Sequence, residues 1–466
     1  MISAPFVWFL LPILLAIGYF FIWHDKTVHI LCGWTSLILA SLAVVLPPNS
    51  PIDIPGVNFI LSPEFRFFER TFSLARSDQG ILLLVYLFGA IMFFTASILD
   101  LPKRNSVIQL AVLGIMVGSI SVDPFLYSAI LIEFASLILV PTMTSSRGEL
   151  ARGALRFIAN QSLGMPFILL AGFLLTGVEA GPNDLTIVLQ AMLMLALGFS
   201  FLLSIFPFYA WATMLAKQIP PHSLVFITFV MPFFAILLGL DFIEKYSWLR
   251  ESNTLFEMIR IVSLITISSA AVWMAFEKNL GKTTALAVLL STGLALLSIS
   301  TEVKQLVLPL FFNISFANII FVGLISTCST LLYQKTDSLE LATLAGAGRK
   351  FPFLTSGIVV AILAISGVPL FGNSTAIITI FGFGNGDWSQ FLLVMVCGGF
   401  VLFSAYRIFR ILFSTEQYMG ISPSETKVEK LFVSTSIAIL IVLNLIPNLL
   451  PISLFQIQEA MPNFLR

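Results

Sequence analysis

The stretch LLSIFPFYAWATMLAKQIPP, residues 202–221, is the part of the sequence that most directly indicates the fold. An apolar run of about 20 residues leads into it from Leu185, and that length is enough to cross a bilayer. Pro207 interrupts the run, because proline lacks a backbone N–H and clashes with the carbonyl four residues earlier. Helices that break at membrane depth usually line a polar space, so the stretch predicts a broken transmembrane helix beside a functional zone.

The composition indicates that the whole chain lies in a membrane. Of 466 residues, 58% are hydrophobic and 10% are charged, and the mean hydropathy is +1.00. A soluble domain carries about 25% charged residues, so the expected solvent of this chain is the lipid bilayer. Because 24 basic residues balance 24 acidic ones, we expect no nucleic acid among its partners.

Apolar segments long enough to cross a bilayer recur along the whole sequence, about 14 in number. They predict an all-α, polytopic membrane protein in which residues 1–466 form a single membrane domain. The longest polar connection, residues 47–78, is too short to be a second domain. The predicted spans lie near residues 4–22, 28–46, 79–99, 105–122, 124–144, 157–176, 186–206, 222–240, 257–276, 283–300, 305–333, 353–381, 388–412 and 430–451.

Two of these spans are interrupted in the same way. The seventh contains SIFPFYAW around Pro207, and the twelfth contains SGVPLFGNS around Pro369. A single proline is common in membrane helices, but matching interruptions in two halves of a chain are typical of an internal repeat. We therefore predict broken helices at Pro207 and Pro369, with the functional zone between them.

The distribution of Lys and Arg predicts the orientation in the membrane. If the amino terminus is outside, the cytoplasmic connections contain 16 of the 24 basic residues, as the positive-inside rule favours. Both termini then lie on the outer side, and we expect the first span to be retained rather than cleaved. The 16 residues are Lys26, Lys103, Arg104, Arg147, Arg152, Arg156, Lys217, Lys278, Lys282, Lys335, Arg349, Lys350, Arg407, Arg410, Lys427 and Lys430.

One acidic residue, Glu133, lies deep inside a predicted span. It occupies the middle of VDPFLYSAILIEFASLILVPTMT, residues 122–144, where an acidic group costs about 2.5–3.5 kcal/mol on insertion scales. Either a cation pairs with this carboxyl group, or it stays protonated and donates a hydrogen bond. Glu133 is therefore a candidate proton relay, and a purely structural glutamic acid is the alternative.

The remaining reactive side chains indicate no catalytic or metal site. Cys32, Cys328 and Cys397 lie far apart inside apolar runs, as packing residues do. His24 and His29 lie at a helix boundary, and His222 follows two prolines. Because no haem-type histidine pair, cysteine cluster or glycine fingerprint occurs, we predict no cofactor, no metal and no catalytic residue in this chain.

Several local phrases resemble one known family, the antiporter-like membrane subunits shared by respiratory complex I, membrane-bound hydrogenases and Mrp antiporters. LIEFASLILVP (131–141) is similar to the fifth-helix phrase of the family, and FPFYAW (206–211) to the phrase that follows its broken seventh helix. AISGVPLFGNSTAIITIFGFG (364–384) resembles its broken twelfth helix. The resemblance covers nearly the whole length, and further similar stretches are 151–175, 220–221, 277–299 and 443–451.

The resemblance implies a bundle of about 14 helices with two inverted five-helix repeats, which we expect at about residues 105–240 and 257–412. In proton-translocating members, a glutamate on the fifth helix faces a lysine on the broken seventh, and further lysines and a histidine continue a polar axis at mid-membrane. Glu133 matches the glutamate. The other positions of that axis depart from the family and are occupied by Leu202, Phe233, Ser291, Ala317 and Ala376.

These departures weaken the predicted proton path. A lysine in a dry interior titrates readily and passes protons to water, whereas leucine, phenylalanine and alanine cannot. Lys217 and His222, beyond Pro207 on the cytoplasmic side, remain candidate proton-relay residues together with Glu133, although a cation at a helix end commonly only reaches toward the membrane surface. Polar residues near the breaks either satisfy freed backbone groups or hold water.

The sequence therefore predicts an antiporter-like subunit of a complex I-like, hydrogenase-like or Mrp-related assembly. We expect proton or cation translocation to be weakened or lost, with a structural or coupling role beside other hydrophobic membrane subunits. The expected location is the inner (plasma) membrane of a bacterium or archaeon, or the equivalent membrane of an organelle. The alternatives are a stand-alone secondary transporter that binds an ion or solute at the breaks, and a chain in which protons still cross through water and Glu133 alone.

Overall fold

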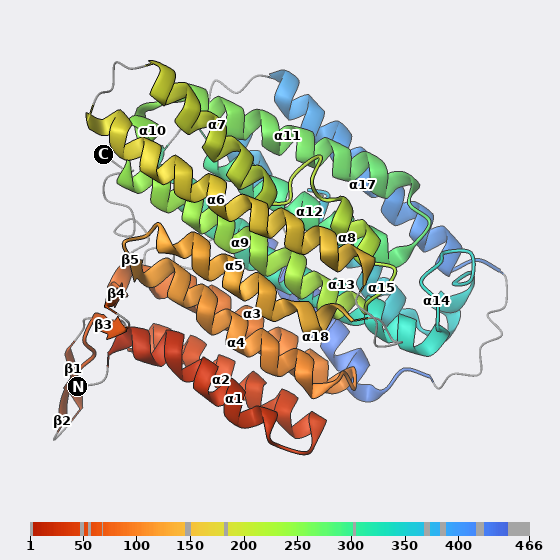
Figure 1. Cartoon of the computed structure of the whole chain (residues 1–466). Coiled ribbons are helices and arrows are strands. Elements are labelled where there is room, and N and C mark those ends of the chain that lie inside the picture. Colours follow the sequence, from red (N-terminus) through yellow and green to blue (C-terminus); the bar gives the residue numbers. More distant parts are fainter. Residues whose placement is uncertain are drawn as a thin grey trace.

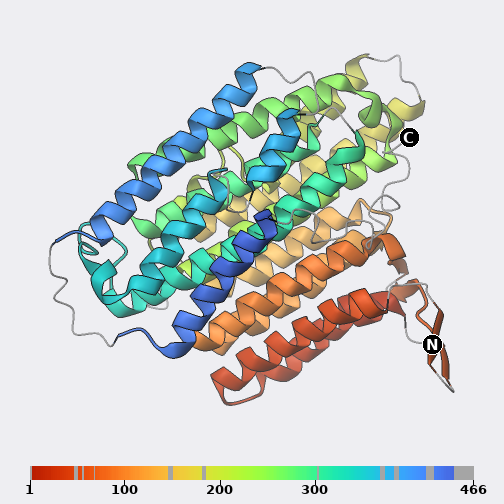
Figure 2. The same ribbon diagram turned by 180° about the vertical axis from the view of Figure 1, so that it is seen from behind.

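The computed structural model describes residues 3–46, 51–54, 57–67, 69–144, 151–180, 185–301, 304–367, 373–382, 388–415 and 424–445. Its helices lie alongside one another in one bundle, drawn from two sides in Figures 1 and 2. They are η1 Phe6–Leu10, α1 Leu11–Phe20, α2 Asp25–Val45, η2 Arg76–Asp78, α3 Gln79–Ile98, α4 Lys103–Ser121, α5 Tyr127–Leu139, η3 Val140–Met143, α6 Arg152–Ala180, α7 Leu185–Leu202, α8 Ala210–Leu215, α9 Pro221–Lys245, α10 Ser247–Glu251, α11 Asn253–Phe276, α12 Leu280–Ile299, α13 Lys304–Thr336, α14 Ala347–Lys350, α15 Pro352–Ile365, α16 Ser374–Gly382, α17 Trp388–Leu412 and α18 Lys427–Leu445.

This architecture confirms the predicted class, an all-α polytopic membrane protein. Among the described residues, nine helices are long and apolar enough to cross a membrane, and four shorter apolar helices accompany them. Where the structure describes them, the predicted apolar ranges coincide with helices from α1 to α18; the range 222–240, for example, lies within α9. Residues 368–372 of the twelfth predicted span and 446–451 of the last lie outside the described residues. The predicted number of crossings and the division into two repeats stay predictions.

The centre of the bundle is formed by α9, α12 and α13. In the candidate spans of α9 and α12, 94% of the residues are buried by other parts of the chain, against 33% in α6 and α17. A helix that is apolar all round must be surrounded by other helices, whereas a helix at the rim presents one face to its surroundings. The helices α1 and α2 lie along one edge of the bundle, and α17 lies along the opposite edge (Figures 1 and 2).

The polar connection between α2 and α3 contains short strands, which the hydropathy pattern did not indicate. Strand β1 (Pro51–Ile54) pairs antiparallel with β2 (Val57–Ile60), and β3 (Glu64–Phe67) pairs antiparallel with β4 (Arg70–Ser73). Strand β4 also pairs with β5 (Val122–Asp123), which lies between α4 and α5. The connection is therefore attached to the end of the bundle by backbone hydrogen bonds.

The helix that leads into Pro207 is broken, as the sequence predicts. Helix α7 ends at Leu202, residues 203–209 form turns, and the short helix α8 follows. The second predicted break falls between α15 and α16, and Pro369 itself lies outside the described residues.

Candidate functional site

A polar vestibule opens where the first turn of α4 meets the turn between α8 and α9, the start of α12 and the end of α13. Its volume is about 670 Å³. Two cationic side chains, Arg104 and Lys217, and two anionic ones, Asp337 and Glu340, line it. A space of this size with charges of both signs can hold water.

Lys217, a proton-relay candidate from the sequence, lies at the mouth of this vestibule. Its side chain is exposed in the turn that follows α8. Arg104, on the other side, donates from Nη2 to Thr144 Oγ1 over 2.8 Å. Lys217 therefore lines the polar vestibule and does not enter the apolar interior.

His222 lies directly behind the vestibule, in the first turn of α9, and is 1% exposed. Its Nε2 atom is 3.0 Å from the Met92 carbonyl oxygen and 3.1 Å from Thr95 Oγ1, both on α3. A carbonyl oxygen only accepts hydrogen bonds, so Nε2 carries the proton. In the neutral ring, Nδ1 then has no proton and can only accept a hydrogen bond. Nδ1 is buried without a hydrogen-bond partner among the described residues. The ring therefore keeps one lone pair that is available to a donor.

A second buried histidine, His29 of α2, has both ring nitrogens satisfied. Its Nε2 donates to the Leu101 carbonyl over 2.7 Å, and its Nδ1 accepts from Ser106 Oγ over 2.7 Å. The sequence placed His29 at a helix boundary, and the structure buries it completely in the second turn of α2. Of these two rings, His222 is the one that retains an open site.

Glu133 lies on α5 at the border between the buried and the exposed face of that helix. Ile132 is buried, whereas Ile130 and Phe134 are 40% and 53% exposed. The Oε2 atom of Glu133 is buried and has no hydrogen-bond partner within the described ranges. No ion pair to Glu133 occurs there either. The carboxyl group thus lies in the bundle without a basic partner among the residues that the structure describes.

Side-chain amides of α6 satisfy backbone groups that the break after α7 sets free. Asn160 Nδ2 donates to the Phe208 carbonyl over 3.0 Å, and Gln161 Nε2 donates to the Leu202 carbonyl over 3.4 Å. Of the two roles that the sequence left open for polar groups near this break, these contacts correspond to hydrogen bonding within the fold. The amides were missed in the sequence because they are uncharged and lie 48 and 41 positions from their acceptors.

The positions where the resembled family has a charged axis are buried in this chain. Leu202 packs against Gly164, where an added Cβ would lie 2.8 Å from the leucine side chain. The ring of Phe233 stacks on Phe311 at 5.8 Å, and Ser291 donates its hydroxyl to a carbonyl of its own helix. The middle of the bundle is therefore closed by packing at Leu202, Phe233, Ser291, Ala317 and Ala376, which are all at most 8% exposed.

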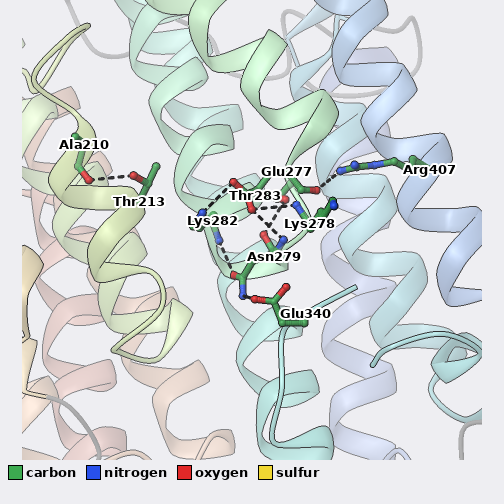
Figure 3. Close-up of polar contacts among 9 residues, drawn as sticks. All are labelled: Ala210, Thr213, Glu277, Lys278, Asn279, Lys282, Thr283, Glu340 and Arg407. Carbon is green, nitrogen blue, oxygen red and sulfur yellow. Dashed lines mark hydrogen bonds and ion pairs between the residues drawn. The ribbon is translucent and has the colours of Figure 1, made fainter. Parts of the chain in front are cut away.

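A second polar cluster, drawn in Figure 3, joins α11, α12 and α17 beside the vestibule. Glu277 Oε2 lies 3.2 Å from Lys282 Nζ, and the Glu277 carbonyl accepts a hydrogen bond from Arg407 Nη2. Asn279 Nδ2 donates to Glu340 Oε1 over 3.1 Å (Figure 3). Glu340 and Arg407 are 61 and 130 positions from their partners in this cluster, so the sequence gave no signal that they meet it. Among the described residues, no group of three or more His, Cys, Asp or Glu could hold a metal ion.

The sequence matches no family model. Part of it is similar to a curated protein of Staphylococcus saprophyticus subsp. saprophyticus whose name describes an antiporter subunit, mnhD2, with 25% identity over 206 residues. This match covers 43% of the chain and 41% of the relative, so the matched segment spans less than half of the relative's length.

The fold is similar to chains in three membrane complexes of known structure. A chain of respiratory complex I from Thermus thermophilus has a TM-score of 0.74 and 16% identity, with 99% of each chain covered. A chain of the Mrp complex from Dietzia sp. DQ12-45-1b has a TM-score of 0.80 and 14% identity, covering 99% of this chain and 97% of the other. A chain of the membrane-bound sulfane sulfur reductase, an archaeal respiratory membrane complex, has a TM-score of 0.78 and 16% identity, covering 98% and 97%.

Together, fold and partial sequence match define the class: an integral membrane protein with the fold of the antiporter-like subunits. The resemblance that the phrases around Glu133, Pro207 and Pro369 predicted is confirmed by these comparisons. The related chains are parts of multisubunit membrane complexes.

Proposed function

We propose that this chain is an antiporter-like subunit of a multisubunit membrane complex and that its own route for protons across the membrane is interrupted. The fold that it shares with chains of complex I, the Mrp complex and the sulfane sulfur reductase supports this assignment. The chain packs beside other hydrophobic membrane subunits and has a structural or coupling role.

The observation that carries the proposed interruption is the absence of a base beside Glu133 in the described residues. A relay across a bilayer needs successive groups that accept and release a proton, and the cost of burying them keeps their number small. Here the position expected for the facing lysine is Leu202, buried against Gly164. A proton on Glu133 therefore has no hydrogen-bonded or ion-paired base to move to among the described residues.

The vestibule side retains the means to take up a proton. Lys217 lines the vestibule, and the ring nitrogen Nδ1 of His222 behind it has no hydrogen-bond partner among the described residues. In this proposal, Lys217 and His222 belong to an uptake half that opens to the cytoplasm, and both termini lie on the outer side. In intact cells, the cysteine of a Lys217→Cys variant should not react with a membrane-impermeant thiol reagent, and it should react once the cells are permeabilised. Reaction in intact cells would mean that the chain has the opposite orientation.

Purification in mild detergent tests the assignment as a subunit. We expect the tagged chain to co-purify with other hydrophobic membrane proteins and to lose thermal stability when they are removed. A stand-alone secondary transporter would instead remain stable alone and would gain stability when its solute binds. That second result would contradict the proposal.

Glu133→Gln tests whether translocation is interrupted. Because Glu133 has no basic partner in the described chain, we expect proton movement in membranes that contain the assembled complex to be unchanged by this substitution. Glu257→Gln, which alters an exposed carboxylate on α11, is the matched control. Loss of proton movement in the Glu133 variant alone would mean that this residue still relays protons.

A further inference from the structure

Helix α4 carries two buried amide side chains whose polar atoms lack partners. Asn105 and Gln109 are 6% and 0% exposed. Among the described residues, Asn105 Oδ1 and both Oε1 and Nε2 of Gln109 have no hydrogen-bond partner. Buried polar atoms of folded proteins are almost always satisfied by protein or by ordered water. Three unsatisfied atoms within two turns of one helix therefore point to bound water.

The position of these amides connects them to the vestibule. Asn105 is itself part of the vestibule lining. Gln109 follows it by four residues, so both side chains lie on one face of α4, one turn apart. Asn105 Nδ2 also donates to Ser223 Oγ, in the first turn of α9, over 3.1 Å. Asn105 thus connects the vestibule lining with the beginning of α9, and Gln109 lies one turn further along α4.

His222 precedes Ser223 in that first turn and supplies the fourth unsatisfied atom, Nδ1. Its Nε2–H is already engaged with the Met92 carbonyl, so Nδ1 can only accept a hydrogen bond. A water molecule bound to the amides has the donor that this atom lacks. His29, whose two nitrogens are both engaged, has no need of such a water.

The row formed by the Asn105 and Gln109 side chains ends one turn further along α4. Leu113, four residues after Gln109, lines a cavity of about 10 Å³ together with Phe88, Phe229 and Phe233. The rings of Phe88 and Phe229 lie 4.7 Å apart, and those of Phe229 and Phe233 lie 5.9 Å apart. A space this small between aromatic rings gives water no polar partner and stays dry.

We propose that Asn105 and Gln109 bind a short file of water molecules that leads from the vestibule to Nδ1 of His222 and ends blind at Leu113. The occupant is water, and the route is one that a proton can follow from the vestibule to the histidine. Its role in proton uptake rests on the proposed function, whereas the presence of water does not.

Cysteine accessibility tests the water file directly. In the full chain with Cys32, Cys328 and Cys397 replaced by alanine, Asn105→Cys, Gln109→Cys and Leu113→Cys are exposed to Ag⁺ in native membranes. Unreacted thiols are then counted by mass spectrometry after denaturation and alkylation. We expect Ag⁺ to protect the cysteines at 105 and 109 and to leave the one at 113 free. Equal lack of protection at 109 and 113 would overturn the proposal.

A second variant keeps the test decisive if a cysteine variant does not fold. Gln109→Leu removes the amide while keeping a side chain of similar size. If the site is hydrated, the substitution leaves the unfolding temperature unchanged or lowers it. If the site is dry, it removes an unsatisfied buried amide and raises the unfolding temperature. A raised unfolding temperature would contradict the water file and leave the assignment as a membrane subunit untouched.

Discussion

At the scale of the residue, the contrast between Leu202 and Glu133 is the basis of the proposed interruption of the proton route. Leu202 fills the space above Gly164 and offers no proton acceptor. Glu133 keeps a buried oxygen without a partner among the described residues. The same inward positions that could form a relay are used here for packing and for satisfying the backbone.

Asn160 provides a test of that structural role. Replacing it by leucine leaves the partly buried Phe208 carbonyl without its donor, so the cost should lie at the lower end of the about 1–3 kcal/mol of an unsatisfied buried group. We expect Asn160→Leu to lower the unfolding temperature in detergent. Gln190→Leu, at an exposed position of α7, should leave it nearly unchanged. Equal unfolding temperatures for the two variants would show that Asn160 does not support the break.

Single residues were predictable from the sequence where charge made them conspicuous. Glu133 stands out because a carboxylate within an apolar run is rare. Asn105, Gln109 and Asn160 carry no charge, and their importance depends on partners, or missing partners, from distant helices. Hydropathy alone could not distinguish them from other polar residues of membrane helices.

At the scale of the element, an ion pair joins the end of α13 to the start of α18. Lys335 Nζ lies 3.1 Å from Glu429 Oε1, and the two side chains are only 10% and 7% exposed. Removal of one partner from a buried pair leaves an uncompensated charge, which costs about 3–5 kcal/mol. We expect Lys335→Met to lower the unfolding temperature strongly.

The matched control replaces both partners. In Lys335→Met/Glu429→Met no buried charge remains, so much of the lost stability should return. Unfolding temperatures of the wild type, both single variants and the double variant form a double-mutant cycle. Simple additivity of the two single effects would argue against a direct pair.

Glu425, in the connection before α18, predicts a pH dependence of stability. Its Oε1 accepts the backbone N–H of Leu354 at the start of α15 over 2.8 Å. Burial raises the pKa of this carboxyl group above its ordinary value of 4.5, although hydrogen bonds from the Leu354 and Phe353 backbone and the charge of Lys430 oppose the shift. The folded state therefore holds the proton more tightly than the unfolded state.

The sign of the effect follows from this difference. The stabilisation that protonation of Glu425 contributes to the folded state is complete below pH 4.5, and it is lost as the pH rises through the folded-state pKa. Glu425→Gln keeps an oxygen that accepts from Leu354 and removes the titration. We expect the unfolding temperature of the wild type to fall, relative to this variant, as the pH is raised above 4.5. Parallel curves for the two proteins would contradict this prediction.

Helices were predictable at this scale because span length and apolar runs are set by the bilayer. The break after α7 was also predictable, because Pro207 cannot continue a helix. The strands β1 to β5 were not, because segments of two to four residues outside the membrane carry too little periodic signal. The exact start of α12 was also missed, so that Lys282 falls in its first turn, paired with Glu277.

At the scale of the whole molecule, the described bundle combines a polar vestibule at one end with a closely packed middle. The vestibule, Lys217 and His222 lie at one end, and apolar packing fills the inward positions at mid-membrane. The class and the membrane location followed from composition, and the resemblance supplied the architecture. The proposed interruption of the proton route depends on contacts between helices, which no local stretch of sequence contains.

The central claim is that this chain alone cannot carry a proton across the bilayer. The most direct measurement is proton flux into liposomes that contain the full-length folded chain, driven by a pH gradient and followed with an internal pH-sensitive dye. We predict the same rate as in protein-free liposomes. A sustained flux that disappears in the Glu133→Gln variant would contradict it.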